Sequence, residues 1–228
     1  MEGTTVAKKK KDLNRRLRAW GIEGDRSMDG SYIFAEMEVE RLLRRLQTLE
    51  EENAELLERA DRDVLTGLWN RGVFDDALEE SMGTRFCLML IDIDYFKSVN
   101  DTHGHDVGDE VIKYVVSKFR PEFFGRDSIV ARWGGEEFAI LMRDDHRKNS
   151  FRNAAEKVRE AVAGRAFVIH GTTVRVPVTI SIGVRIASAS EKDPQMIFKD
   201  ADVALRRSKE GGRNQTNFHI NAESLKIV

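Results

Sequence analysis

The chain has 228 residues, 41% of them hydrophobic and 33% charged, which suits one globular domain of ordinary size plus an extension. Its net charge of −2 gives no general attraction to nucleic acid or anionic membrane, and its single cysteine, Cys87, excludes an internal disulfide and argues against a zinc cluster. No apolar stretch approaches the roughly 18 residues of a membrane span and no hydrophobic signal segment opens the chain, so we expect a soluble, cytoplasmic protein that binds no nucleic acid.

Residues 1–31 are expected to form a basic, flexible arm followed by a connector. Positions 8–11, 15, 16 and 18 are all lysine or arginine, against only two acidic residues in the first twenty. Such an arm could touch membrane lipid or nucleic acid, but a solvated tail is the simpler interpretation, which we favour. Gly21, Gly24 and Gly30, with short polar residues between them, predict an irregular connector.

Residues 32–60 carry an apolar repeat of about 3.5 residues without Gly or Pro, which predicts a helix with a coiled-coil seam. Asn53 occupies an a position, where a polar side chain is tolerated best when it pairs with its own copy in a parallel two-stranded coil. We therefore expect a homodimer through a parallel coiled coil, in which Arg45 could reach Glu50 of the partner helix. The alternative is an amphipathic helix folded back on its own domain. The seam consists of Tyr32, Ala35, Val39, Leu42, Leu46, Leu49, Asn53, Leu56 and Ala60.

Residues 61–228 alternate between helical and strand patterns and are expected to form one domain. This alternation predicts an α/β or α+β sheet domain whose sheet is covered mostly on one side. The expected helices are 71–82, 108–119, 147–164 and 194–209, and the expected strands are 86–92, a hairpin around 134–135, a β-rich run over 172–186 and a short strand near 215–219.

Two acidic segments are expected to meet at one metal site. An unbroken apolar run ends in Asp92-Ile93-Asp94, and Glu136 and Glu137 follow a Gly-Gly turn between two β-prone runs. Oxygen ligands without a soft partner select Mg²⁺ or Mn²⁺ over zinc, and such ions neutralise phosphate oxygens in nucleotidyl transfer. A solvated turn is the usual alternative for acidic pairs, but the buried strand before Asp92 argues against it. Asp94 could face the same way as Asp92 or only brace the turn.

Several sequence blocks occur in a fixed order between about residue 61 and residue 218. The blocks are Leu65-Thr66-Gly67-Leu68, Asn70-Arg71, Asp92-Ile93-Asp94-Tyr95-Phe96-Lys97, Asn100-Asp101, Gly104-His105-Asp106, Gly108-Asp109, Arg132-Trp133-Gly134-Gly135-Glu136-Glu137-Phe138, Ala201-Asp202, and Lys209 with Gly212-Arg213-Asn214. This ordered series resembles the GGDEF-domain diguanylate cyclases. A lone Gly-Gly-Glu-Glu-Phe could be accidental, whereas the whole series is highly specific.

The resemblance implies both a fold and an activity. The fold is a ferredoxin-like nucleotidyl-cyclase palm of the α/β (α+β) class, with a central, mostly antiparallel sheet, here preceded by the N-terminal coiled-coil helix. The activity is that of a Mg²⁺-dependent diguanylate cyclase, which condenses two GTP into cyclic di-GMP and releases pyrophosphate. Each domain of a dimer holds one GTP, and each 3′-hydroxyl attacks the other's α-phosphate. A regulatory protein could bind the N-terminal segment.

Two alternatives remain open at this point. The chain could be an inactive GGDEF domain that senses GTP or cyclic di-GMP, although the intact Gly134 to Glu137 argue against this. It could also be a coiled-coil scaffold with a passive globular part.

The resemblance assigns roles around the metal and the phosphates. Asp92, the Ile93 carbonyl and Glu136 bind the metal, and Glu136 or Glu137 serves as the catalytic base. The backbone amides of the turn after the strand hold the β- and γ-phosphates, and a basic pair near the last helix grips them. Two glycines let the phosphates approach the backbone. These phosphate-binding residues are Tyr95, Phe96, Lys97, Lys209, Arg213, Gly134 and Gly135.

The resemblance also assigns the guanine contacts. Asn100 and Asp109 match the positions that read the guanine edge, since a carboxylate accepts hydrogen bonds from N1–H and N2–H and adenine has no donor at N1. Related enzymes that make mixed guanine-adenine dinucleotides carry a small hydroxyl residue at the position of Asp109. His105 matches a residue at the family's substrate site.

Some positions depart from the family's usual pattern. Val64 stands in place of Pro, Trp133 in place of Tyr or Phe, and Arg206 in place of Tyr, which puts local packing in doubt more than catalysis. Many members bind their product through an Arg-x-x-Asp motif, but Gly125 and Ser128 occupy those two positions here. We therefore expect weak or no feedback inhibition, and restoration of inhibition in a Gly125→Arg, Ser128→Asp double variant.

Overall fold

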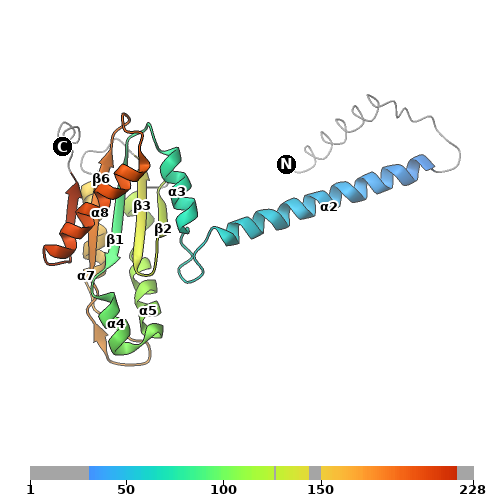
Figure 1. Cartoon of the computed structure of the whole chain (residues 1–228). Helices are drawn as coiled ribbons and strands as arrows, with labels where there is room; N and C mark the ends of the chain where they lie inside the picture. Colours follow the sequence, from blue (N-terminus) through green and yellow to red (C-terminus); the bar gives the residue numbers. More distant parts are fainter. Residues whose placement is uncertain (1–30, 126, 144–149, 220–228) are drawn as a thin grey trace. The chain divides into compact units, whose positions relative to one another are not determined.

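The computed structural model describes residues 31–125, 127–143 and 150–219 (Figure 1). The predicted basic arm and connector therefore lie outside the described residues, except for Ser31. The chain divides into two compact units, Met1–Leu57 and Glu58–Val228, and each is described by itself. None of the helices within the described ranges is long and apolar enough to cross a membrane.

The described part of the first unit is most of helix α2 (Ser31–Ala60), which is continuous over the segment where a helix was predicted. Leu42, Leu46 and Leu49 of the predicted seam are 56%, 55% and 44% exposed. Side chains at 31–38 and 53–59, including Asn53, lie outside the described set. Dimerisation through this seam stays a prediction.

The second unit contains a five-stranded sheet in the order β2-β3-β1-β6-β7 and a separate two-stranded sheet of β4 and β5. All pairs are antiparallel except β6 with β7, so the predicted mostly antiparallel sheet is confirmed. The elements are α3 (Arg71–Glu80), β1 (Phe86–Ile93), α4 (Phe96–His103), α5 (His105–Val116), α6 (Pro121–Phe124), β2 (Ile129–Arg132), β3 (Glu137–Arg143), α7 (Ser150–Ala163), β4 (Phe167–Val168), β5 (Arg175–Val176), β6 (Ile180–Ala187), α8 (Pro194–Glu210) and β7 (Thr216–His219).

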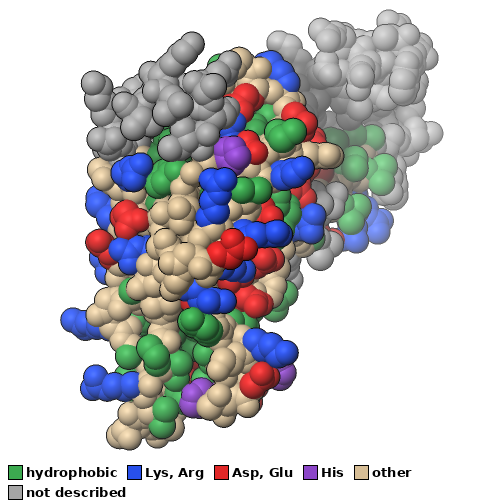
Figure 2. Space-filling model, turned by 60° about the vertical axis from the view of Figure 1, so that its left-hand side comes forward, with side chains coloured by type: hydrophobic (Ala, Val, Ile, Leu, Met, Phe, Trp, Pro, Cys, Tyr) green, Lys and Arg blue, Asp and Glu red, His purple; other side chains and the backbone are tan. Residues whose placement is uncertain are grey.

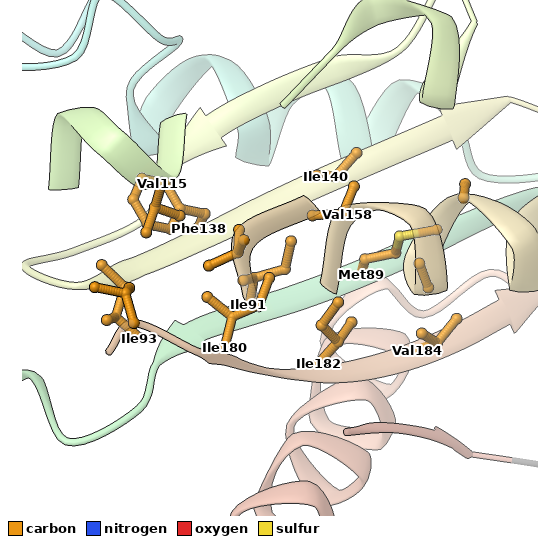
Figure 3. Close-up of a cluster of buried hydrophobic side chains, with 14 of the residues drawn as sticks. Met89, Ile91, Ile93, Val115, Phe138, Ile140, Val158, Ile180, Ile182 and Val184 are labelled. Atoms are coloured by element: carbon orange, nitrogen blue, oxygen red, sulfur yellow. The ribbon is translucent and has the colours of Figure 1, made fainter. Parts of the chain in front are cut away.

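The central strand β1 is buried on both faces, so the expected one-sided cover is wrong. Its odd-numbered side chains, such as Met89 and Ile91, pack with α5 and α7 (Figure 3), and its even-numbered ones, such as Leu88 and Leu90, pack with α3 and α8. A strand without polar alternation must be covered on both faces, because either exposed face would leave apolar surface in water.

Helix α4 was not predicted from the sequence. Its residues include Ser98, Asn100, Asp101 and Thr102, which are weak helix formers, so propensity gives little signal there. The expected helix at 108–119 is α5, which begins three residues earlier, at His105.

Helix α8 packs directly on the backbone of β6. A Cβ atom on Gly183 would lie 2.2 Å from the amide nitrogen of Leu205 and 2.3 Å from the carbonyl oxygen of Ala201. The buried Ser208 hydroxyl donates to the carbonyl oxygen of Ile182 at 2.7 Å. Only glycine at position 183 allows this approach, which sets the height of α8 above the sheet.

The face seen in Figure 2 carries acidic and basic side chains interspersed, without a large patch of one sign. This distribution agrees with the small net charge of the chain.

Candidate active site

The end of β1 and the hairpin between β2 and β3 lie side by side, as the sequence predicted. Asp92 is the register partner of Glu137, and the Ile93 amide donates to the Glu136 carbonyl oxygen at 3.3 Å. The hairpin closes tightly, with the Glu137 amide donating to the Gly134 carbonyl at 3.3 Å. Asp92, Ile93, Glu136 and Glu137 are therefore gathered in one place.

The carboxyl group of Asp92 is largely buried and lies among other charged groups. Burial raises its pKa to about 6; the hydrogen bond and charge of Lys209 oppose this rise, and the charges of Glu136 and Glu137 add to it. The Lys209 ammonium lies 2.7 Å from Asp92 Oδ2. Three neighbouring carboxyl groups with one ammonium beside them form a site that further positive charge would stabilise.

The donor set at this position fits Mg²⁺ or Mn²⁺. Within the part of the chain that the structure describes, no three His, Cys, Asp or Glu side chains are grouped so that they could hold a metal by themselves. Mg²⁺ commonly takes one or two protein carboxylates and completes its shell with substrate phosphates and water. This preference is met by two carboxylates, Asp92 and Glu136, and the Ile93 carbonyl oxygen, none of which is a soft donor.

The turn after β1 presents backbone amides for an anion. Tyr95 has a left-handed backbone, with φ 57° and ψ 25°, and α4 begins at the next residue. The first amides of a helix have no intrahelical acceptor, so those of Phe96 and Lys97 can cradle phosphate oxygens. The Phe96 side chain is buried in the core, so only its amide can serve a ligand. The Lys97 side chain is exposed and makes no contact with the other site residues among the described interactions.

Arg213 lies over this turn, although the two segments are 118 residues apart. Its guanidinium carbon is 4.3 Å from the centroid of the Tyr95 ring. Both predicted phosphate-binding cations, Lys209 and Arg213, are thereby placed at the end of β1.

The predicted guanine-reading residues come from α4 and α5. Asn100 Oδ1 is buried and has no hydrogen-bond partner among the described residues. It points at Gly108, where a Cβ atom would lie only 1.9 Å away, so the amide of Asn100 is held beside the start of α5. Asp109 follows on α5 and is exposed. An amide oxygen without a partner next to an exposed carboxylate fits a ligand that supplies hydrogen-bond donors.

His105 is the first residue of α5 and is exposed. Among the described interactions it contacts none of the other predicted site residues. Its predicted role at the substrate site stays a prediction.

The structure reveals one structural role that the sequence did not predict, that of Arg132, and decides between the two interpretations of Asp94. Arg132 directly precedes Trp133 and the Gly-Gly turn, and in the structure its guanidinium donates to the Asp63 carboxylate and to the carbonyl oxygen of Gly135. Asp94 accepts hydrogen bonds from Thr179 and Ser181, at 2.7 and 2.6 Å. The structure therefore supports the bracing interpretation of Asp94.

The unusual residue at position 133 is accommodated by packing. The Trp133 ring lies 4.5 Å from that of Phe198 and 5.5 Å from that of Phe74, measured between centroids. The guanidinium of Arg71 covers it at 4.2 Å. The two other departures, Val64 and Arg206, are exposed and disturb no core contact.

Comparisons with known proteins agree with this geometry. A family model described as "Diguanylate cyclase, GGDEF domain" matches residues 60–215. The probable diguanylate cyclase DgcT of Escherichia coli K12 is 40% identical over 164 residues, which are 68% of this chain and 35% of DgcT. The response regulator PleD of Caulobacter vibrioides is 37% identical over 164 residues, 69% of this chain and 36% of PleD. The chain thus spans about a third of the length of these curated relatives.

Two solved structures share the fold and more than the globular unit. The coiled coil and GGDEF domain of DgcB from Caulobacter crescentus, in complex with c-di-GMP, has a TM-score of 0.73 and 32% identity, and covers 81% of this chain and 98% of its own. The diguanylate cyclase SiaD from Pseudomonas aeruginosa, in complex with its activator SiaC, has a TM-score of 0.65 and 29% identity, and covers 94% of this chain and 83% of its own.

Proposed function

Because the chain belongs to the GGDEF family of diguanylate cyclases, we propose that it condenses two molecules of GTP into cyclic di-GMP and releases two molecules of pyrophosphate. One observation carries this proposal. The end of β1 and the Gly-Gly hairpin bring Asp92, Glu136 and Glu137 together beside the ammonium of Lys209. An inactive relative would not need to keep this costly cluster of carboxylates.

Asp92, the Ile93 carbonyl and Glu136 would hold Mg²⁺ or Mn²⁺. When bound, the cation neutralises charge that develops on phosphate oxygens during nucleotidyl transfer. Lys209, which pairs with Asp92 in the structure, would then be available to contact a phosphate.

The chain's own groups supply the remaining chemistry. Glu136 or Glu137 accepts the proton of the attacking 3′-hydroxyl. The amides of Phe96 and Lys97, with Arg213, hold the β- and γ-phosphates, and the two glycines of the hairpin leave room for them. These contacts fix the triphosphate while the α-phosphate is attacked, and pyrophosphate leaves.

Guanine is selected by Asn100 and Asp109. The Asp109 carboxylate accepts from N1–H and N2–H of guanine, and Asn100 Oδ1, which has no partner among the described residues, gains a hydrogen bond. Adenine presents no donor at N1, so it would leave the Asp109 carboxylate poorly satisfied.

The active form is a homodimer, because one domain supplies only half of the reaction centre. The exposed seam of α2 supports a parallel coiled coil as the dimer contact. The similarity to a coiled coil and GGDEF domain of DgcB points the same way. SiaD was solved with its activator SiaC, and we assign the N-terminal segment of this chain to an analogous regulatory protein. Since GTP is a cytoplasmic nucleotide, the reaction belongs in the cytoplasm.

A single incubation tests the proposal. Purified full-length protein is mixed with GTP and MgCl₂, and the products are identified by mass spectrometry. We expect cyclic di-GMP with two pyrophosphates per molecule, and none when the metal is chelated. Tight GTP binding without turnover would instead support a nucleotide sensor, and weak binding of both GTP and Mg²⁺ would support a coiled-coil scaffold.

A further inference from the structure

We propose that Tyr95 positions Arg213 for the triphosphate: its exposed ring acts as a stacking platform, and the neighbouring Asp94 anchors the backbone that carries the arginine. The inference rests on the proposed function, because the ligand it concerns is the triphosphate of GTP. It assigns Tyr95 a side-chain role, whereas the phosphate turn uses only its backbone.

The backbone around this contact is unusual. Tyr95, Arg213 and Asn214 are the only non-glycine residues with positive φ in the described ranges, at 57°, 64° and 45°. Each such conformation is unfavourable for an L-residue and persists only where surrounding contacts fix it. All three residues meet in one place, so the strain is concentrated where the phosphates are expected.

Asp94 fixes the backbone on the far side of this contact. Its buried carboxylate accepts from the amide of Asn214 at 2.9 Å, in addition to the hydroxyls of Thr179 and Ser181. The side chain of Asn214 is held as well, since Arg159 Nη1 donates to its Oδ1 at 3.0 Å. The segment that follows Arg213 is therefore tied to the end of β1.

Tyr95 fixes the side chain. The guanidinium carbon of Arg213 lies 4.3 Å from the ring centroid, and Nη1 donates to the phenolic oxygen at a long 3.4 Å. The Tyr95 residue is 64% exposed, so the ring has no part in the core. A planar guanidinium stacks on an aromatic face by cation–π attraction and dispersion.

The consequence concerns nucleotide affinity. A free arginine side chain has many rotamers and loses that freedom when it grips a phosphate. Stacking on Tyr95 removes part of this entropy loss before GTP arrives. Arg213 grips the phosphates from substrate binding onward, so loss of the ring should raise the Kd and the KM by a larger factor than it lowers kcat.

The test compares two substitutions of similar size. Tyr95→Leu removes the ring, and Tyr95→Phe keeps it. We expect Tyr95→Leu to raise the Kd for a non-hydrolysable GTP analogue with Mg²⁺, and the KM for GTP, by about 3- to 5-fold. Tyr95→Phe should keep the Kd and the KM close to their wild-type values. Equal affinities for the wild type and Tyr95→Leu, with GTP turnover intact, would overturn the inference alone. A wild type that does not bind the analogue would contradict the proposed function and the inference with it.

A double-variant cycle separates positioning from a general structural effect. In an Arg213→Ala background, Tyr95→Leu should change the Kd no further, because the ring acts through the arginine. Additive losses would overturn the inference. A readout that needs no nucleotide is the Nε–H proton resonance of Arg213, which the ring should shift upfield in the wild type and in Tyr95→Phe. An Nε–H resonance at the same position in Tyr95→Leu would show that no stack forms in solution.

Discussion

Arg132 joins the turn that opens the globular unit to the hairpin that carries Glu136, a proposed metal ligand. Its Nη1 donates to both carboxylate oxygens of Asp63 at 3.1 Å, and its Nε and Nη2 donate to the carbonyl oxygen of Gly135 at 3.1 and 2.8 Å. Gly135 directly precedes Glu136. The same turn is tied to the last residue of α2, since Asn70 Nδ2 donates to the Ala60 carbonyl at 2.6 Å. A short chain of hydrogen bonds thus runs from the end of α2 to the Gly-Gly hairpin.

Asp63→Asn should weaken this link. Partial burial favours the neutral form of Asp63, but hydrogen bonds from Thr66 and Arg132 and the charge of Arg132 outweigh it, and the pKa of Asp63 lies below its ordinary value. The variant should lose about 1 to 2 kcal/mol of unfolding free energy at pH 7, measured by urea denaturation. Asp76→Asn, on the exposed face of α3, is the control.

The pH dependence of this loss has a definite sign. A depressed folded-state pKa contributes stability that is present above the unfolded pKa of about 4 and is lost as the pH falls through the folded value. The difference in unfolding free energy between the wild type and Asp63→Asn should therefore become smaller below about pH 4. A gap that stays constant or widens in acid would contradict the ion pair.

Glu136→Gln should abolish most turnover while leaving the fold intact. The substitution keeps the side-chain size but removes the charge that holds the cation, so cyclic di-GMP formation should fall by at least about 10²-fold. The exposed Glu79→Gln is the matched control. Near-wild-type turnover of a folded Glu136→Gln protein would remove this residue from the catalytic site.

Asp109 should determine the choice of base. In equimolar GTP and ATP the wild type should make cyclic di-GMP with a preference of at least about 10²-fold over a mixed dinucleotide. Asp109→Ser should relax this preference, whereas Asp106→Ser, one turn earlier on α5, should keep it. Mass spectrometry distinguishes the products, and a mixed dinucleotide as the main wild-type product would refute the assignment.

Leu46→Lys should separate the dimer and lower activity. Lysine in the apolar seam would bury an unpaired charge in a coiled coil, whereas Gln47→Lys lies off the seam and keeps Glu51 as a neighbour. Light scattering should show Leu46→Lys as a monomer, with specific activity that falls most in dilute enzyme. A Leu46→Lys monomer with full activity at nanomolar concentration would contradict an obligatory dimer.

Feedback inhibition through the Arg-x-x-Asp position should be weak or absent. The structure corrects one expectation here, because Gly125 has φ 90° and ψ 165°, a conformation that essentially only glycine adopts. The Ser128 hydroxyl donates a hydrogen bond to the Phe124 carbonyl oxygen at 2.6 Å. Gly125→Arg should therefore destabilise the protein by about 1 to 3 kcal/mol and should not restore inhibition.

Initial-rate assays with added cyclic di-GMP, combined with thermal unfolding of the Gly125→Arg, Ser128→Asp variant, check both statements. The neighbouring Arg126 lies outside the described residues. Tight inhibition of the wild type that survives Arg126→Ala would show that another site binds the product.

The sequence was sufficient to predict those elements and site residues that depend on a local pattern of neighbouring residues. The apolar run before Asp92 predicted β1, and the Gly-Gly hairpin predicted the place of Glu136, because both depend on neighbouring residues only. The bond of Arg132 to Asp63 joins residues 69 apart, and that of Ser181 to Asp94 joins residues 87 apart. No spacing rule relates such pairs, so the partner of each residue can be identified only from the folded sheet.

The direct contact of α8 with Gly183 restricts where control can act. At Gly183 backbone atoms of Ala201 and Leu205 lie directly against β6, so we expect α8 not to slide along the sheet and the backbones that carry Lys209 and Asp92 to keep their spacing. The half of the reaction centre that one domain supplies should therefore keep its internal geometry when an incoming signal changes the activity. We expect amide hydrogen exchange within α8 and β6 to be the same in resting and stimulated protein, with the difference confined to the residues that join α2 to the sheet.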